Sequence, residues 1–141
     1  MATSNRPYLC YALAARKSAR HLSRLYDSHL APAGLSVSQY SILALLQKYA
    51  PLKFDELADI MTMERTTLVR ALKPLLAAGW VVTERPDNGR AFDVTLSPSG
   101  LEKFAEATPL WAKAQAAFEN EVGRDRAIRF RDGILGFKLG E

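Results

Sequence analysis

Hydroxyl and basic side chains occur at helical spacing in one segment near the middle of the chain, residues 65–78. Neighbouring residues of a helix are separated by about 100°, and on such a wheel one arc carries only leucines, namely Leu68, Leu72, Leu75 and Leu76. The opposite arc carries polar residues, namely Thr66, Arg70 and Lys73, with Thr67 beside them. Arginine pairs bidentately with guanine, and threonine contacts bases or thymine methyl groups. The division predicts a recognition helix for DNA; a solvated helix face is the simpler alternative.

The preceding segments supply the elements that would position this helix. A short helix is predicted over residues 54–61, and a three-residue turn, 62–64, separates it from the longer helix. Gly79 is a suitable C-cap because glycine adopts a positive φ at little cost. A short helix, a turn and a longer helix in this order are typical of a helix-turn-helix, whose second helix enters the major groove.

A β-hairpin is predicted directly after this helix. Residues 80–85 are rich in valine and threonine, and residues 90–96 alternate apolar and polar side chains. The Asp-Asn-Gly sequence at 87–89 is typical of a tight hairpin turn. Arg85 and Arg90 stand at the two bases of this turn. We interpret the hairpin as a wing whose arginines approach a minor groove; an ordinary charged turn is the alternative.

Both ends of the chain are predicted to be helical. Apolar residues recur at helical spacing over residues 8–30, and Ser36 with Gln39 forms a capping-box pattern for the next helix. After the hairpin, a helix opens at Ser97-Pro98 and passes Pro109, where a kink is expected. A last helix is expected over residues 124–139.

The expected fold class is therefore mainly α with a small β-hairpin wing (α+β). A winged helix-turn-helix is assigned to residues 37–97, and a helical dimerisation region to residues 1–36 and 98–141, in one compact chain without a separate linker. The apolar faces of these terminal helices are larger than one small domain needs.

Composition excludes several other classes of protein. Hydrophobic residues make up 48% of the 141 residues, so disorder is not expected, and the net charge of +4 is compatible with nucleic acid. No apolar run approaches the roughly 20 residues that span a bilayer. Cys10 is the only cysteine, which favours a reducing, cytoplasmic setting. Because no nucleophile–base pair, phosphate loop or metal-ligand cluster occurs, we expect neither an enzyme nor a cofactor or metal site.

The order of these motifs resembles the MarR family of bacterial transcription regulators. The resemblance covers roughly residues 8–139 and is densest over 54–100, where the carrying sequences are Asp55-Glu56-Leu57-Ala58, Met63 to Arg70, Leu75 to Val81, Arg85 to Arg90 and Leu96 to Gly100. It implies a homodimer held by the first and last helices, and a repressor released from DNA by a small aromatic or phenolic acid. It also implies that Arg65, Thr66, Thr67 and Arg70 meet the major groove.

The resemblance also assigns the wing. It implies that Arg90 is the wing arginine and Asp87 its partner, with Arg85, Asn88 and Lys73 completing the predicted DNA contacts. Two features depart from the family pattern. Ala91-Phe92 stands where a second basic wing residue is common, which predicts weaker wing binding. Pro74 lies inside the recognition helix, where it removes one backbone donor.

Three sets of residues outside the winged helix have open interpretations. Cys10 is either a small buried apolar residue or a peroxide-sensing thiol. The basic stripe of the first helix is a solvated face, a phosphate contact or a site for an anionic effector such as an aromatic carboxylate or an acyl-coenzyme A; its members are Arg16, Lys17, Arg20 and Arg24. The candidate effector residues are Arg16, Arg20, His21, Tyr40, Phe104 and Trp111, although the histidine and the aromatic residues are also compatible with packing.

These observations lead to one main hypothesis and two alternatives. The main hypothesis is a homodimeric repressor on a palindromic operator, with half-sites roughly 10 bp apart. The first alternative is a redox-sensing regulator that acts through Cys10. The second is a winged-helix module that binds protein without DNA, because a fold alone does not define a function.

Overall fold

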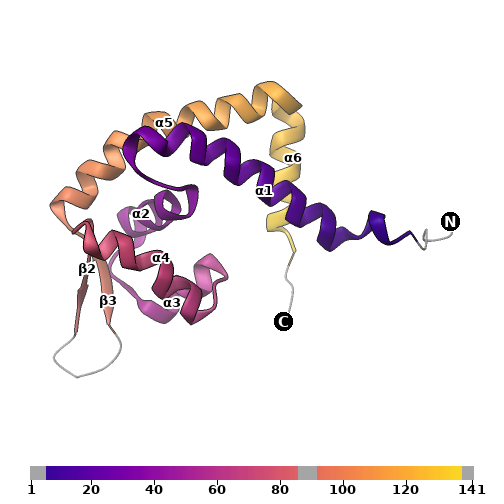
Figure 1. The fold of residues 1–141 in the computed structure, drawn as a ribbon. Coiled ribbons are helices and arrows are strands. Elements are labelled where there is room, and N and C mark those ends of the chain that lie inside the picture. The colour runs from indigo at the N-terminus through magenta and orange to yellow at the C-terminus, as the bar shows by residue number, and fades with distance from the viewer. Residues whose placement is uncertain (1–5, 86–91, 138–141) are drawn as a thin grey trace.

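The computed structural model describes residues 6–85 and 92–137, and these form a mainly helical chain with one small sheet (Figure 1). The helices are α1 (Tyr11–Leu30), α2 (Val37–Tyr49), α3 (Phe54–Met61), α4 (Arg65–Ala77), α5 (Pro98–Val122) and α6 (Arg124–Leu135). The strands are β1 (Leu52–Lys53), β2 (Val81–Glu84) and β3 (Asp93–Leu96). The predicted fold class, a winged helix-turn-helix flanked by terminal helices, is confirmed.

Local capping explains where several helices begin and end. The Ser36 side chain accepts from the backbone of Gln39 at 3.2 Å, and the Gln39 side chain accepts from the backbone of Ser36 at 2.9 Å. Ser97 caps α5 in the same way, by accepting from the Gly100 backbone at 3.0 Å. Gly79 follows α4 with a φ of 77°, a conformation that glycine adopts without steric strain. These boundaries agree with the sequence because capping residues act on the first or last turn of their own helix.

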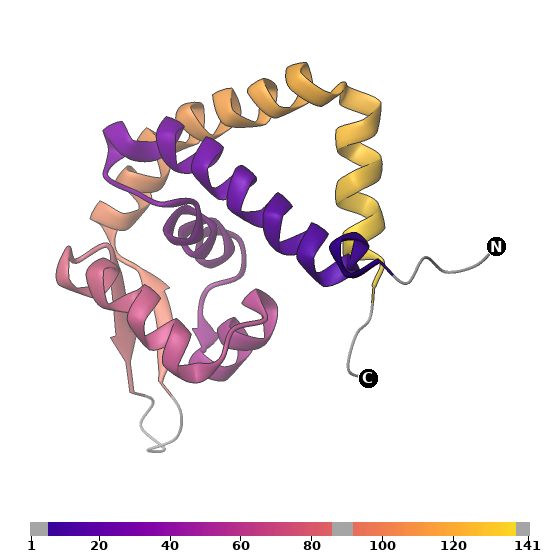
Figure 2. The same cartoon turned by 45° about the vertical axis from the view of Figure 1, so that its right-hand side comes forward.

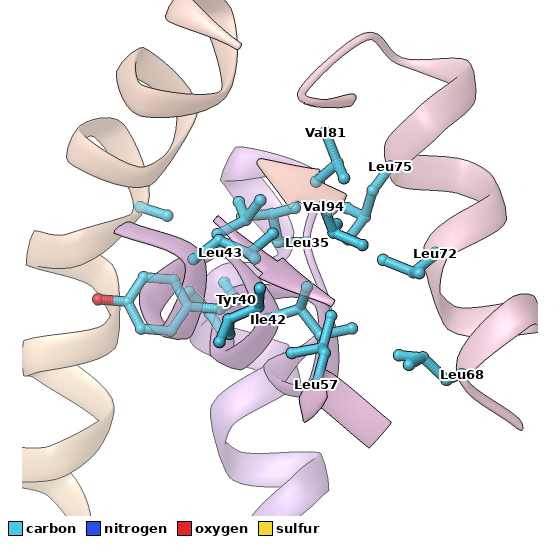
Figure 3. Close-up of a cluster of buried hydrophobic side chains, with 14 of the residues drawn as sticks. Leu35, Tyr40, Ile42, Leu43, Leu57, Leu68, Leu72, Leu75, Val81 and Val94 are labelled. Carbon is cyan, nitrogen blue, oxygen red and sulfur yellow. The ribbon is translucent and has the colours of Figure 1, made fainter. Parts of the chain in front are cut away.

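The three strands form an antiparallel sheet in the order β1-β3-β2. Leu52 of β1 pairs with Val94 of β3, and Thr83 of β2 pairs with the same valine from the other side. The sheet, α2, α3 and α4 enclose most of the main core, to which α1 and α5 add Leu30 and Ala107. Leu75 of α4 lies beside Val81 and Val94, and Leu72 and Leu68 follow it along the helix (Figure 3). This core gives α4 a fixed base from which its other face points to solvent.

The helices α1, α5 and α6 form a frame on the side of the molecule opposite α3 and α4 (Figures 1 and 2). α5 continues through Pro109 and follows a curved course, as expected for a proline inside a helix. The Tyr26 hydroxyl of α1 donates to Gln115 Oε1 of α5. Burial raises the pKa of Tyr26, and the nearby Glu119 carboxylate raises it further.

Several predicted boundaries were wrong. The first helix begins at Tyr11 rather than Tyr8, after a short 3-10 turn at Pro7–Leu9, and α6 ends at Leu135. The strands of the hairpin are shorter than expected, and the strand Leu52–Lys53 was not predicted, because two residues carry no periodic signal. Leu76 is 40% exposed rather than buried with the other leucines of α4. No helix among the described residues is long and apolar enough to cross a membrane.

Candidate nucleic-acid interface

The two faces of α4 differ as the helical wheel predicted. Leu68, Leu72 and Leu75 are each at most 3% exposed and fasten the helix to the core. The predicted DNA-contacting residues of the helix are all exposed, and they are Arg65, Thr66, Thr67, Arg70 and Lys73. Their donors and hydroxyls therefore extend from a rigid base, which is what contact with base edges and phosphates requires.

The turn between α3 and α4 sets the direction of α4. Thr62 ends α3 with a φ of 54°, a left-handed conformation that non-glycine residues adopt only rarely. The Met63 amide donates to the Ala58 carbonyl at 2.9 Å, which closes the end of α3. The predicted three-residue turn is confirmed, but its left-handed threonine was not anticipated.

Arg65, the first residue of α4, is held by two side chains at the start of α3. Its guanidinium forms an ion pair with Asp55. The guanidinium carbon also lies 5.0 Å from the centroid of the Phe54 ring. Both charged groups remain largely exposed, at 70% and 64%, so the pair contributes little to stability. Its effect is to orient an arginine at the solvent-facing start of the recognition helix.

The wing places a second arginine on an aromatic ring. Arg85 follows β2 and is exposed, and its guanidinium carbon lies 4.6 Å from the centroid of the Phe92 ring, just before β3. Asp87, Asn88 and Arg90 lie outside the described residues, so their predicted contacts stay predictions. The hairpin and α4 project on the same side of the molecule, away from α5 (Figures 1 and 2).

Three of the candidate effector residues pack against one another. The ring of Tyr40 is stacked on Phe104 at a centroid distance of 5.3 Å and on Trp111 at 5.9 Å. The Tyr40 hydroxyl points toward α5 (Figure 3) and lies 3.0 Å from the Thr108 hydroxyl. Tyr40 itself is only 5% exposed. These contacts join α2 to α5 as part of the packing between the core and the frame.

The other candidate effector residues lie on α1. His21 borders a hollow of about 510 Å³ between α1, α5 and α6, whose walls include Phe118, Phe130, Glu121 and Arg126. The Tyr40 cluster is not part of this hollow. Arg16 and Arg20 are exposed and do not line it. The structure therefore separates the six predicted effector residues into an aromatic stack, a hollow beside His21 and an exposed basic stripe.

Cys10 lies at the N-cap of α1 and is exposed in this chain. The interpretation of Cys10 as a small buried residue is therefore wrong for the single chain. Cys10 lies between the 3-10 turn Pro7–Leu9 and the first residue of α1, Tyr11. Among the described residues, no group of three or more histidine, cysteine or acidic side chains is arranged to hold a metal ion.

Sequence reasoning missed the residues that hold the two arginines. Phe54 was interpreted as part of a short helix, Asp55 as part of that helix and of a family motif, and Phe92 as the loss of a basic wing residue. One signal was available for Asp55: it lies ten residues before Arg65, across a short helix and a three-residue turn. The contact between Arg85 and Phe92 depends on hairpin register, which the turn sequence only approximates.

The exposed polar face of α4, the short α3 before it and the hairpin after it define a protein of the winged helix-turn-helix class. The family model described as "MarR family" matches residues 35–92 of this chain. The HTH-type transcriptional regulator YwoH of Bacillus subtilis (strain 168) is 30% identical over 116 residues, which cover 82% of this chain and 79% of YwoH.

Solved structures agree with this classification. The Mycobacterium tuberculosis transcriptional regulator MosR, in a complex with DNA, superposes with a TM-score of 0.79 and 32% identity, covering 90% of this chain and 93% of MosR. Escherichia coli MarR in its apo form shares the fold with a TM-score of 0.73, at 18% identity and with coverage of 89% and 95%. The chain therefore belongs to the MarR family, and it is a transcription regulator.

Proposed function

We propose that this protein is a homodimeric regulator that binds a palindromic DNA operator and represses transcription from it. The observation that carries the proposal is the exposed face of α4, where Arg65, Thr66, Thr67, Arg70 and Lys73 stand on a buried leucine base beside the wing. MosR, a relative at 32% identity, was solved in a complex with DNA, which supports the same role here.

The amino acids on this face suit major-groove recognition. An arginine such as Arg70 can pair bidentately with a guanine, while threonines such as Thr66 and Thr67 suit bases, thymine methyl groups or phosphates. Lys73 and Arg85 supply charge for phosphates, and they position the protein without reading sequence. The predicted contacts of Asp87, Asn88 and Arg90 would extend this surface along the wing.

Dimerisation is supported by the apolar surface of the frame. Tyr11, Leu135 and Phe137 are 89%, 74% and 71% exposed, and they stand on the terminal elements of the chain. Large apolar side chains that stay this exposed on both terminal elements favour a surface that another molecule covers. A second copy of the chain would cover it, and a two-fold dimer would read two half-sites about one helical turn apart.

The test is a fluorescence-anisotropy titration of the purified protein against promoter DNA that flanks its own gene, with random duplex as competitor and salt varied. We expect specific binding whose affinity falls steeply with salt, because phosphate contacts release counterions. Arg70→Ala should weaken operator binding by roughly 1–3 kcal/mol through loss of a bidentate base contact. Lys113→Ala, which removes the same charge from an exposed position on α5, is the matched control.

Two results would contradict this function. If Arg70→Ala binds the operator as tightly as the wild type, the assignment of α4 as the recognition helix is contradicted. Binding no tighter than to random duplex, on every flanking fragment, would favour the alternative of a winged-helix module that binds protein.

We further propose that a small aromatic or anionic effector, such as an aromatic acid or an acyl-coenzyme A, releases the DNA. The hollow beside His21 supports this proposal, because its volume of about 510 Å³ suits a small ligand and it combines two phenylalanines with the cation Arg126. Addition of aromatic carboxylates and coenzyme A thioesters to the same titration tests it. An active compound should lose potency in His21→Ala, and a full screen without release would contradict the proposal.

A redox response through Cys10 is a second candidate, which the exposure of that thiol favours. Peroxide treatment should then release DNA from the wild type while Cys10→Ser protein stays bound. Equal release from both proteins would contradict this candidate.

A further inference from the structure

Phe92 occupies a central position at the end of the sheet nearest the wing tip. β3 pairs with β1 and β2 in registers that place Asp93 opposite both Lys53 and Glu84. Continuing both registers by one residue places Phe92 between Phe54 on one side and Arg85 on the other. Residues that are directly opposite one another in an antiparallel sheet share a face. The three side chains therefore belong to one cross-strand row.

Contacts along this row agree with the register. The Phe54 amide donates to the Phe92 carbonyl at 3.2 Å. The Arg85 guanidinium carbon lies 4.6 Å from the centroid of the Phe92 ring. Phe92 nevertheless remains 43% exposed, whereas Val94, two residues further on and on the same face, is fully buried. The Phe92 ring therefore lies where the core ends and the solvent-facing surface of the wing begins.

The start of α4 repeats the same arrangement. The Arg65 guanidinium carbon lies 5.0 Å from the centroid of the Phe54 ring and is also paired with Asp55. Two arginines from the two candidate DNA-binding elements thus each lie on a phenylalanine. A single backbone hydrogen bond, between Phe54 and Phe92, joins the two phenylalanines.

We propose that Phe92 is a positioning residue for DNA binding, which orients Arg85 toward a backbone phosphate and aligns it with Arg65 at the start of α4. The proposal rests on the DNA-binding function proposed above. An arginine stacked on a ring keeps its N–H donors at the edge of the guanidinium plane, where a phosphate can accept from them. Fixing that orientation before DNA arrives reduces the side-chain entropy that binding would otherwise cost.

This role is the opposite of the one that the sequence predicted for Phe92. The aromatic residue stands near the place where the family often has a second basic wing residue, and its presence predicted a weaker wing. The geometry shows that the ring instead supports a cation that the wing already has. Phe92 acts through Arg85, so its removal should matter only while Arg85 is present.

The test compares Phe92→Leu, Phe92→Trp, Arg85→Ala and the double variant Arg85→Ala/Phe92→Leu, in anisotropy titrations of the full-length protein on the operator at several salt concentrations. Phe92→Leu should lose about two- to fivefold in affinity, the loss expected for an exposed cation–π pair. The slope of affinity against salt should fall toward that of Arg85→Ala, because one phosphate contact is lost. Phe92→Trp, which keeps an aromatic face, should bind like the wild type.

The double variant separates positioning from simple packing. In the Arg85→Ala background, Phe92→Leu should cause no further loss of affinity, because the two residues act as one unit. Val82→Ala is the matched control, since Val82 is a 37% exposed apolar residue of β2 on the other face of the sheet. It should leave both affinity and salt slope unchanged.

Three results would overturn the inference. Phe92→Leu with wild-type affinity and salt slope would show that Arg85 needs no ring. An equal loss from Phe92→Leu with and without Arg85 would assign Phe92 to packing alone, and so would a Phe92→Trp protein that binds as weakly as Phe92→Leu. Failure of the wild type itself to bind any operator would instead refute the proposed function, and this outcome is visible before any variant is compared.

Discussion

The winged-helix region, residues 37–97, and the frame of α1, α5 and α6 differ in which apolar side chains they bury. In the winged-helix region, large residues such as Leu43, Leu57 and Leu68 are fully buried. The buried positions of α5 and α6 are glycine or alanines, namely Gly100, Ala107, Ala114 and Ala127. The frame leaves large apolar residues such as Leu135 exposed instead. The winged-helix region thus supplies most of the large side chains of the main core, to which the frame adds Leu30 and Ala107, while several large apolar side chains of the frame stay exposed.

The difference corresponds to two tasks. A recognition helix must be held rigidly, because a small displacement of α4 would misplace every base contact. Under the proposed function the frame associates with a second copy and responds to an effector, so close helix packing through small residues and an uncovered apolar surface suit it better. The following predictions test this division, and they are ordered from the largest expected effect to the smallest.

Truncation inside the winged-helix region should have the largest effect. Leu57→Ala should lower the free energy of unfolding by about 2–5 kcal/mol, because it removes a fully buried side chain and leaves a cavity. Ile60→Ala, in the same helix but 48% exposed, should change it by less than about 1 kcal/mol. Urea denaturation followed by circular dichroism measures both, and equal losses would remove the distinction between the two sites.

Substitution where α5 of the frame contacts the winged-helix region should lower stability by nearly as much. A Cβ added at Gly100 would collide with the backbone carbonyl oxygen of Trp80, so Gly100→Ala should destabilise the fold by about 1–3 kcal/mol. Gly133 in α6 has no atom close enough to meet an added Cβ. Gly133→Ala should therefore stabilise its helix, by roughly 0.5–1 kcal/mol. Thermal melts compare the two, and a Gly100→Ala protein as stable as the wild type would contradict the close approach.

Substitution on the exposed apolar surface of the frame should weaken dimerisation and leave the fold of the single chain intact. Leu135→Glu places a charge on the exposed apolar surface, so we expect the dimer dissociation constant to rise at least about tenfold with little change in helical content. Sedimentation velocity over a range of concentrations measures the association. Ile60→Glu is the control for a charge on an exposed apolar residue elsewhere. A Leu135→Glu protein that dimerises as tightly as the wild type would place the interface elsewhere.

The contact between α1 and α5 should give the smallest effect. Burial and Glu119 raise the pKa of Tyr26 above its usual value of 10.0. The folded state therefore holds the proton more tightly, and the stability that this contributes is fully present below pH 10.0 and is lost as pH rises through the folded-state pKa. Wild-type stability should fall more steeply above this pH than that of Tyr26→Phe. Urea denaturation at several pH values measures the free energy of unfolding of both proteins. An equal fall of that free energy with pH in the two proteins would contradict the raised pKa of Tyr26.

The features that the sequence alone determined are local ones. The caps at Ser36 and Ser97, the glycine after α4 and, apart from Leu76, the two arcs of α4 were predicted correctly, because each depends on residues within one or two helical turns. The order of these elements along the chain was enough to predict the fold class, since each short connection restricts how its neighbours can pack.

Only the tertiary structure decided which distant side chains meet. The strand Leu52–Lys53 exists because β3, some forty residues later, pairs with it. That pairing places Phe54 beside Phe92, and the wing register places Arg85 on the same ring. Likewise, Tyr40 stacks on Phe104 and Trp111, whereas His21 lies beside a separate hollow. Spacing along the chain shows which face of an element a residue occupies, but contacts between elements depend on register and packing, which arise only when the whole chain folds.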